Sequence, residues 1–250
     1  MCIRYSKDID ALVKWSKEIK AWIPLMDWTR GLDTFPGYQA PIVVPDFEHG
    51  RKLINAQWGF TPVWADPSFG KKSGYNARSE TLTTKPAWRE PIKKSRCIVP
   101  ASGFYERDNK RWLKFGTGGV MALAGLYSEP NRHCPTISYA MVTTEPNKVV
   151  EDHHDRMPVI LAPPDMEKWL NPETPVEECL AMLEPYVGEG LRVSDVGPII
   201  KRGDLAQAVR NLMMAGRNVQ EIVEGLWRVD DEELSPEQMV ELALKSSFRT

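Results

Sequence analysis

Residues 97–106 read CIVPASGFYE, an apolar stretch that ends on a glutamate. The side chains from Ile98 to Tyr105 predict a strand, because β-branched and aromatic residues suit a pleated, half-buried surface. Glu106 closes that strand, and the end of a sheet would present such a side chain into a cleft. Glu106 is therefore a candidate for chemistry, and the alternative is a surface glutamate that begins a charged loop.

Short apolar runs of the same kind, divided by turn residues, extend on both sides of this stretch, from Leu53 to about Thr144. Gly116, Gly118 and Gly119 separate two of these runs and predict a hairpin loop. The pattern predicts a strand-dominated core, either a curved antiparallel sheet or an open barrel. The clearest runs are Cys97–Val99, Trp112–Phe115, Val120–Tyr127 and Ile137–Thr143.

Helices are predicted on either side of this core, so the fold class is α+β. Residues 7–22 place apolar side chains on one face at helical spacing. A second helix is expected over 165–170, with Pro164 at its first position. Thr174 and Glu177 have the spacing of a capping box that opens a third helix. The expected architecture is a curved antiparallel sheet or open barrel with flanking helices.

The last part of the chain differs in kind, and we expect residues 201–250 to form a helical C-terminal appendage to a domain of residues 1–200. Apolar faces at helical spacing predict helices near 205–213 and 218–227. The sequence Ser235-Pro236-Glu237-Gln238 has a capping box that opens one more helix.

The turn at residues 215–219 has the look of a helix-turn-helix. The alternative is a helical hairpin that packs on the core or on a protein partner. We favour the hairpin, because residues 218–242 are strongly acidic and a helix that reads DNA must approach phosphates. A protein partner of these helices is therefore a possibility that the sequence leaves open.

The bulk composition is that of a soluble globular protein. The chain has 250 residues, of which 42% are hydrophobic and 26% are charged. It has no apolar run long enough to cross a bilayer and no signal-peptide pattern at its start, so we expect a cytoplasmic protein without a membrane partner. The cysteines lack the spacing of a zinc site, and we interpret Cys97, Cys134 and Cys179 as small buried side chains.

The charge distribution is more informative than the net charge of −2. Between Lys71 and Lys114 the chain has 12 basic residues and 4 acidic ones, whereas residues 116–250 have 12 basic and 22 acidic residues. A basic segment in a nearly neutral protein is typical of a localised phosphate-binding surface. The alternative is a solvated face whose charges pair with the acidic half of the chain.

Cys2 is the most informative single residue, because removal of Met1 would leave a free amine and a thiol on adjacent carbons. Their reference pKa values of about 8 and about 8.5 make both partly reactive near neutrality. Such a 1,2-aminothiol attacks aldehydes: the amine forms a Schiff base and the thiol closes it to a five-membered thiazolidine. The alternatives are an N-terminal nucleophile for amide hydrolysis and an incidental cysteine.

Four motifs together resemble those of the SOS response-associated peptidase (SRAP) family, whose members process abasic sites in DNA. The resemblance covers about residues 1–200, in the family's order, and the set of motifs is highly specific. The motifs are Met1-Cys2 with Arg4, Asn76-Ala77-Arg78-Ser79-Glu80-Thr81, Pro100-Ala101-Ser102-Gly103-Phe104-Tyr105-Glu106, and His154-Asp155-Arg156-Met157-Pro158-Val159-Ile160-Leu161.

The resemblance implies four catalytic residues. Cys2 would be the covalent residue, and Asn76 would hold the attacking amine or the sugar by hydrogen bonds. Glu106 would transfer protons during formation of the Schiff base and opening of the sugar ring. His154 would act on the sugar hydroxyl and on reversal of the crosslink. Glutamate and histidine suit sequential proton transfers because their proton affinities differ.

The resemblance also implies a surface for single-stranded DNA that contains abasic sites. Arg4, Arg78 and Arg156 would hold the phosphates that flank the lesion, through the planar guanidinium fork. Trp64 and Pro41 would stack on or wedge against bases. For Trp64, core packing is an equal alternative.

Three positions depart from the family's pattern. Ile3 replaces the glycine that usually follows the cysteine, so it could crowd the DNA beside the nucleophile. Arg107 replaces the tryptophan that usually follows the motif glutamate, and could add a phosphate contact. The late Val-Asn motif is replaced near Val196-Gly197-Pro198, so the last strand is expected to end differently.

The expected function is a DNA–protein crosslink through a Cys2 thiazolidine at abasic sites, in the response to DNA damage. Associated β-elimination (lyase) chemistry is compatible with it, because a Schiff base acidifies the neighbouring sugar carbon. No metal or cofactor is required, and the protein would associate with the nucleoid when bound to DNA. Two alternatives stay open: a thiol autopeptidase or peptidase that uses Cys2, and a non-catalytic DNA-binding adaptor.

Overall fold

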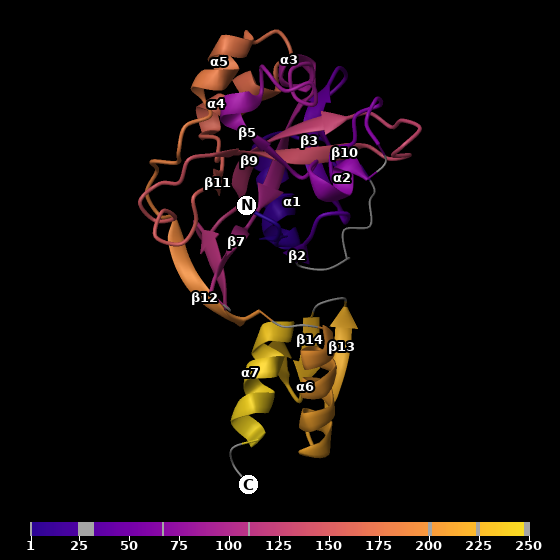
Figure 1. The fold of residues 1–250 in the computed structure, drawn as a ribbon, viewed down its shortest axis with the longest axis vertical. Helices are drawn as coiled ribbons and strands as arrows, with labels where there is room; N and C mark the ends of the chain where they lie inside the picture. The colour runs from indigo at the N-terminus through magenta and orange to yellow at the C-terminus, as the bar shows by residue number, and fades with distance from the viewer. Residues whose placement is uncertain are drawn as a thin grey trace.

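The computed structural model describes residues 2–24, 33–66, 68–109, 111–199, 202–223 and 226–247. Its first part, up to strand β12 (Arg192–Pro198), forms a large lobe of sheets and helices, and residues 202–247 form a small lobe beneath it (Figure 1). The large lobe is mixed α+β with a partly ring-like sheet, which confirms the predicted fold class.

A ring of five strands lies at the centre of the large lobe. Strands β3 and β4 form the long antiparallel hairpin, and β9 pairs with both β6 and β10, so that the order β10-β4-β3-β6-β9 returns to β10. Two short strands, β5 and β11, pair with β10 outside the ring. The bounds are β3 (Gln39–Asp46), β4 (Gly50–Trp58), β5 (Asn76–Arg78), β6 (Arg96–Ala101), β9 (Met121–Ser128), β10 (Ser138–Thr144) and β11 (Met157–Pro158).

A second sheet, with the order β12-β8-β7-β1-β2, lies beside the ring. The chain passes from β6 in the ring to β7 in this sheet at Ser102, so the predicted single strand from Ile98 to Tyr105 is two strands in different sheets. The predicted hairpin at Gly116–Gly119 is also wrong, because β8 and β9 belong to different sheets. The bounds are β1 (Tyr5–Ser6), β2 (Asp33–Thr34), β7 (Gly103–Asp108) and β8 (Arg111–Gly116).

Alternate side chains of the ring strands enter two apolar cores, as the period of two in a strand requires. Val43 and Ile98 pack with the helices on one face. Ile42 and Val99 pack on the other face with the inward side of the second sheet, where Phe104 contributes. The ring therefore supports the second sheet from behind, which fixes the position of β1 and of the residues just before it.

Helices cover the first of these cores. Asp8 caps α1, since its side chain accepts a hydrogen bond from the Ala11 N–H, and α4 begins with two prolines. The predicted capping box at Thr174 is wrong, because α5 begins after Pro175 and has no side-chain cap. The bounds are α1 (Ile9–Glu18), α2 (Phe69–Lys72), the 3-10 helix η1 (Ser79–Thr81), α3 (Pro91–Lys94), α4 (Pro163–Leu170) and α5 (Val176–Ala181).

The small lobe contains both helices and strands, so the prediction of a purely helical appendage is wrong. The segment expected to be helical near 218–227 forms two antiparallel strands, which also excludes the helix-turn-helix. The capping box at Ser235 is confirmed: the Ser235 N–H donates to Gln238 Oε1 at 2.7 Å, and the Gln238 N–H donates to Ser235 Oγ. The bounds are α6 (Arg202–Met214), β13 (Val219–Val223), β14 (Leu226–Val229), β15 (Glu232–Leu234) and α7 (Pro236–Ser247).

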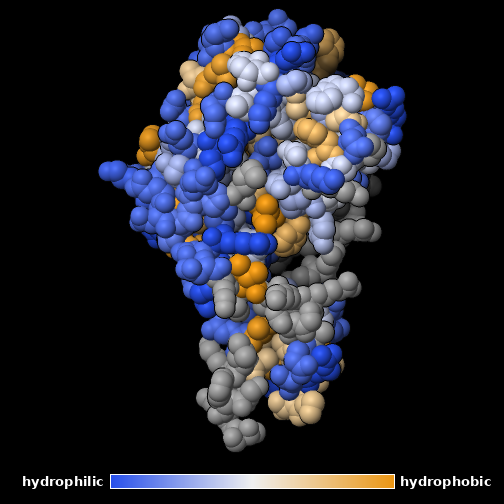
Figure 2. Space-filling model, viewed as in Figure 1, coloured by the Kyte–Doolittle hydropathy of each residue, from blue (hydrophilic) through white to orange (hydrophobic). Residues whose placement is uncertain are grey.

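Hydrophilic side chains cover much of the face shown in Figure 2, and apolar side chains lie in several separate places on it, including a group near its middle. No helix within the described ranges is both long enough and apolar enough to span a membrane. The same ranges contain no group of three or more His, Cys, Asp or Glu side chains placed to hold a metal ion.

Candidate active site

Cys2 lies just before β1, in the core between the ring and the second sheet. Only 1% of its surface is exposed, and its thiol donates a hydrogen bond to the Arg4 carbonyl, with Sγ 3.3 Å from the oxygen. Strand β1 is held between β7 and β2, and the hydroxyls of Tyr5 and Tyr139 lie 2.6 Å apart beneath it. Cys2 and strand β1 are thus part of the core.

Asn76 contacts Cys2 directly. It is the first residue of β5, which runs parallel to β10 and places Asn76 opposite Met141. The Asn76 side-chain N–H donates to the Cys2 carbonyl at 2.8 Å. The other carboxamide atom, Oδ1, is buried and has no hydrogen-bond partner among the described residues. This oxygen can accept a hydrogen bond from a group bound beside Cys2.

Glu106 lies on β7, and only 3% of its surface is exposed. Burial raises the pKa of Glu106 to about 7, because the charged carboxylate loses solvation. The pKa of the Cys2 thiol is also above its ordinary value, first because of burial and then because of the negative charge of Glu106. Glu106 can therefore exchange a proton near neutral pH, whereas the Cys2 thiol keeps its proton.

His154 faces Glu106 from the turn before β11. Its Nε2 lies 3.6 Å from Glu106 Oε2, and the Arg156 N–H donates to its Nδ1 at 3.0 Å. The same Nδ1 also lies 3.1 Å from the Arg156 carbonyl oxygen and 3.1 Å from Asp155 Oδ1, so these contacts fit either tautomer of the neutral ring. Burial lowers the pKa of His154, so the neutral ring predominates at pH 7. The four predicted catalytic residues therefore form one cluster.

Arg4 is placed differently from the prediction, because its guanidinium is already paired. It donates to Asp33 Oδ2 at 2.9 Å and to Glu237 Oε1 at 2.7 Å, and only 2% of its surface is exposed. It also lies over the rings of Tyr105, at 4.3 Å, and Trp112, at 5.2 Å. Burial alone would lower the pKa of Arg4, but the two carboxylates more than offset it and raise that pKa.

Arg156 is likewise buried and paired rather than open to a phosphate. Its guanidinium binds both oxygens of Glu80, at 2.8 and 2.9 Å, and donates to the Thr143 carbonyl at 2.6 Å. Glu80 itself is half exposed, at the start of the stretch that follows β5. The pair ties the loop of His154 to η1, which directly follows β5.

Arg78 and Trp64 are the predicted DNA-binding side chains that face solvent. Arg78 ends β5, two residues after Asn76, and its side chain has no ion pair within the described ranges. Trp64 is 57% exposed, with its ring edge against Phe69, so the core-packing alternative is wrong. Pro41 is buried within β3, so the structure does not present it to a base as predicted.

The departures from the family's pattern have identifiable surroundings. Ile3 is half-buried beside Cys2, and Arg107 is exposed with its guanidinium 4.9 Å from the centre of the Trp112 ring. Gly197 interrupts the register of β12 with β8, and its φ of +129° favours glycine. A Cβ at Gly197 would lie 3.1 Å from the Glu237 Cβ, so this glycine lets α7 approach the sheet.

Sequence reasoning missed the carboxylates that hold these arginines, namely Asp33, Glu80 and Glu237. Glu80 lies within a quoted motif, so its proximity to Arg156 had a signal in the sequence. Glu237 belongs to an acidic tail whose charge was recognised, but its contact with Arg4 joins residues 233 positions apart. Only the folded chain reveals such a pair.

Comparison with known proteins identifies relatives of this chain. The chain matches the SOS response associated peptidase (SRAP) family over residues 1–202. It is 34% identical over 194 residues to the abasic site processing protein YoaM of Bacillus subtilis, an alignment that covers 73% of this chain and 85% of that protein. It is 32% identical over 213 residues to YoqW, an abasic site processing protein of the same organism, covering 80% of this chain and 94% of that protein.

A solved structure has the same fold. A protein from Bordetella bronchiseptica superimposes with a TM-score of 0.67 and 26% identity, over 78% of this chain and 99% of that one. The class of protein is defined by two features: a ring-like sheet, and a cysteine near the N-terminus that clusters with an asparagine, a glutamate and a histidine. The chain belongs to the SRAP family.

Proposed function

We propose that this protein processes abasic sites in single-stranded DNA by forming a covalent crosslink through Cys2, once Met1 has been removed. The observation that carries the proposal is the contact of Cys2 with Asn76, in a cluster that also contains Glu106 and His154. The names of the relatives YoaM and YoqW, both abasic site processing proteins, support the same substrate.

The proposed reaction has two bond-forming steps. The free α-amine of Cys2 adds to the C1′ aldehyde of the ring-opened deoxyribose, and the resulting carbinolamine loses water to give a Schiff base. The Cys2 sulfur then adds to the imine carbon, and its proton moves to the nitrogen. The product is a thiazolidine, so one aldehyde and one aminothiol give one adduct and one water molecule.

Glu106 and His154 provide the proton transfers of these steps. With a pKa of about 7, Glu106 can take a proton from the attacking amine and return it to the leaving hydroxyl. The His154 ring, whose Nε2 lies 3.6 Å from Glu106 Oε2, can exchange a proton with Glu106 or with a sugar oxygen. Asn76 orients the start of the chain through the Cys2 carbonyl, and its free Oδ1 can accept from the amine.

The raised pKa of the Cys2 thiol favours a reaction that begins at the amine over thiol peptidase chemistry. A peptidase cysteine attacks as a thiolate, and its pKa is lowered by a neighbouring cation. Here burial and the charge of Glu106 raise the pKa of the Cys2 thiol instead. In the thiazolidine pathway the thiol attacks an electrophilic imine after the amine has reacted, and its proton is transferred within the same site.

The experiment is a pair of mass measurements. Purified protein should lack Met1, and incubation with a uracil-containing oligonucleotide treated with uracil-DNA glycosylase should add the mass of the strand minus one water. A set of peptides should stay uncleaved under the same conditions. Peptide cleavage without an adduct would support the peptidase alternative, and DNA binding without either would support the non-catalytic adaptor.

Arg78 is expected to bind a backbone phosphate next to the lesion. If it neutralises one phosphate, the Arg78→Ala variant should reduce the slope of log affinity against log salt by about 0.7 for single-stranded DNA. Binding of an oligonucleotide with a tetrahydrofuran abasic analogue, measured by fluorescence anisotropy between low and moderate salt, gives this slope. Lys17→Ala removes an exposed charge from α1 and is the matched control. An unchanged slope for Arg78→Ala would mean that Arg78 does not contact phosphate.

A further inference from the structure

The small lobe contacts the large lobe through the carboxylate of Glu237. This side chain is buried, with 4% of its surface exposed, and Oε1 accepts from Arg4 Nη1 at 2.7 Å. Its other oxygen, Oε2, accepts from the hydroxyl of Ser235 at 2.9 Å. Gly197 provides the room for this approach, as described above. The first turn of α7 is thus fitted against β12 and directed at Arg4.

The sheet face under this contact combines basic and aromatic side chains. The guanidinium of Arg4 lies over Tyr105 and Trp112, and that of Arg107 also lies over Trp112. Lys114 lies 5.9 Å from the centre of the Tyr105 ring. Alternating cations and rings are typical of surfaces for single-stranded nucleic acid. Tyr105 and Trp112 are now only 4% and 5% exposed.

The small lobe is built as a separable unit. The buried apolar side chains that the structure describes in this lobe form a core of their own, and none of these belongs to the two cores of the large lobe. The contacts between the lobes include charged groups. One contact is the Arg4–Glu237 pair. Another involves Arg111 in β8: its hydrogen bond with Asp195 raises its pKa, and the negative charge of Glu241 in α7 raises that pKa further. Salt screens the exposed contact of Arg111 and screens the buried Arg4–Glu237 pair much less, so the buried pair opens only when another anion takes the place of Glu237.

We propose that the C-terminal module, residues 202–247, is an intramolecular competitor of DNA, in which the Glu237 carboxylate occupies the position of a DNA phosphate on Arg4. The inference rests on the proposed function, because it takes a DNA strand as the competing ligand. In the closed state the acidic module covers the face with Arg4, Tyr105 and Trp112. A bound strand displaces α7, and a backbone phosphate then takes the place of the Glu237 carboxylate.

With such competition, the apparent affinity for DNA equals the affinity of the open state multiplied by the fraction of molecules that are open. Glu237→Gln keeps the shape of the side chain but removes the charge by which the small lobe pairs with Arg4, while Asp33 in the large lobe still pairs with it, so the variant raises the open fraction. We expect this variant to bind a single-stranded oligonucleotide with a tetrahydrofuran abasic analogue about tenfold more tightly than the wild-type protein. The gain in affinity should vanish when Arg4→Gln is combined with Glu237→Gln, because the guanidinium for which Glu237 and the phosphate compete is then absent.

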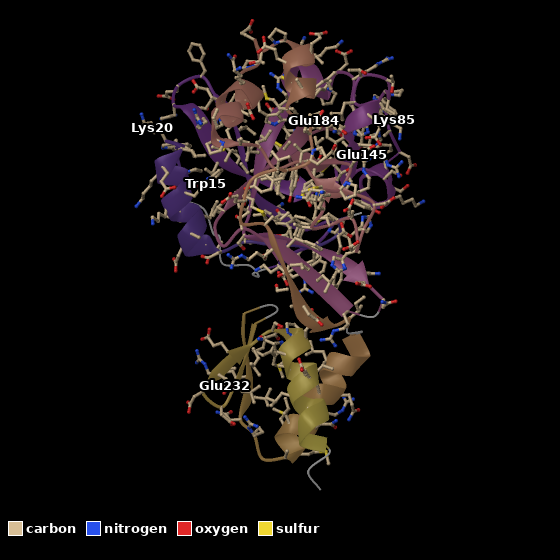
Figure 3. All side chains as sticks on the ribbon, turned by 90° about the vertical axis from the view of Figure 1, so that its left-hand side faces the viewer. Trp15, Lys20, Lys85, Glu145, Glu184 and Glu232 are labelled. Carbon is tan, nitrogen blue, oxygen red and sulfur yellow. The ribbon has the colours of Figure 1, made fainter. Side chains whose placement is uncertain are left out.

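The matched control is Glu232→Gln, which removes the same charge from an exposed position on β15 of the same module (Figure 3). It should bind the oligonucleotide as the wild type does. Equal or weaker binding by Glu237→Gln, relative to Glu232→Gln, would overturn the proposal. The analogue has no aldehyde, so this result is independent of crosslinking, and failure of the crosslink would instead count against the proposed function.

A second measurement needs no variant. Hydrogen–deuterium exchange of the wild-type protein, with and without the same oligonucleotide, reports on the amides of α7. Displacement of the module should speed exchange over residues 236–247 when DNA is bound. Unchanged or slower exchange in α7 on a DNA-saturated protein would overturn the competition, even if Glu237→Gln failed to fold.

Discussion

Cys2→Ala should abolish the heat-stable adduct between this protein and abasic single-stranded DNA. The variant keeps the α-amine, so it can still form a Schiff base, but the imine has no sulfur to close on it and hydrolyses on heating. Wild-type protein should give a band of protein–DNA adduct that survives boiling, and the variant should give only background. Borohydride should trap the Schiff base of the variant, because it reduces the imine to a stable amine.

Cys134→Ala is the control for the loss of a buried thiol. Cys134 is 3% exposed, and its thiol contacts the carbonyl and the hydroxyl of Thr136, away from the cluster around Cys2. This variant should form the adduct as the wild type does. An unreduced, heat-stable adduct of Cys2→Ala in wild-type yield would show that the thiazolidine is not the product.

Glu106→Gln should slow crosslinking by about a hundredfold or more, because it removes a general acid–base group while keeping the shape of the side chain. The ratio of wild-type to variant rates should rise with pH as Glu106 ionises, with a midpoint near its pKa of about 7, and then level off. The amine of Cys2 titrates in both proteins, so the ratio cancels its contribution. A ratio that stays constant between pH 5.5 and 8.5 would exclude Glu106 as the base.

Glu106→Gln should also raise the thermal stability of the protein at pH 8, although it slows crosslinking. The pKa of Glu106 is raised in the folded state, so the unfolded state ionises more readily, and stability falls as pH rises from about 4.5 to about 7. Glutamine lacks this loss. Thermal melts should therefore place the variant above the wild type at pH 8, with the difference shrinking toward pH 5. A variant that melts lower at pH 8 would mean that the carboxylate is needed for the fold.

The fold class could be predicted from the sequence, because short β-branched and aromatic runs divided by turns leave few alternatives to a curved sheet. The segment near 218–227 could not be assigned as easily. Its apolar residues fit the spacing of a helix, yet Val219, Ile222 and Val223 are β-branched and pack well in a strand. In a short apolar segment these two signals conflict, and the structure follows the second.

The motifs predicted which residues lie in the candidate site, but not which of its arginines are free of ion pairs and could bind a phosphate. Asn76, Glu106 and His154 gather around Cys2 from three separate segments, as the resemblance implies. The three arginines have similar positions in their motifs, yet only Arg78 faces solvent unpaired within the described ranges. Whether an arginine is open depends on the carboxylates that the fold brings to it, and sequence spacing does not contain that information.

The short strand β1 has a consequence for how the protein is made. Its partners are β2 and β7, and β7 ends at Asp108, about a hundred residues after Cys2. At translation rates of about 5–20 residues per second, the start of the chain waits roughly 5–20 seconds on the ribosome before β7 exists. Removal of Met1, which the proposed function requires, is expected to precede the folding step that buries Cys2. Removal of Met1 and folding of β1 would then compete in time. A purification tag should therefore be placed at the C-terminus.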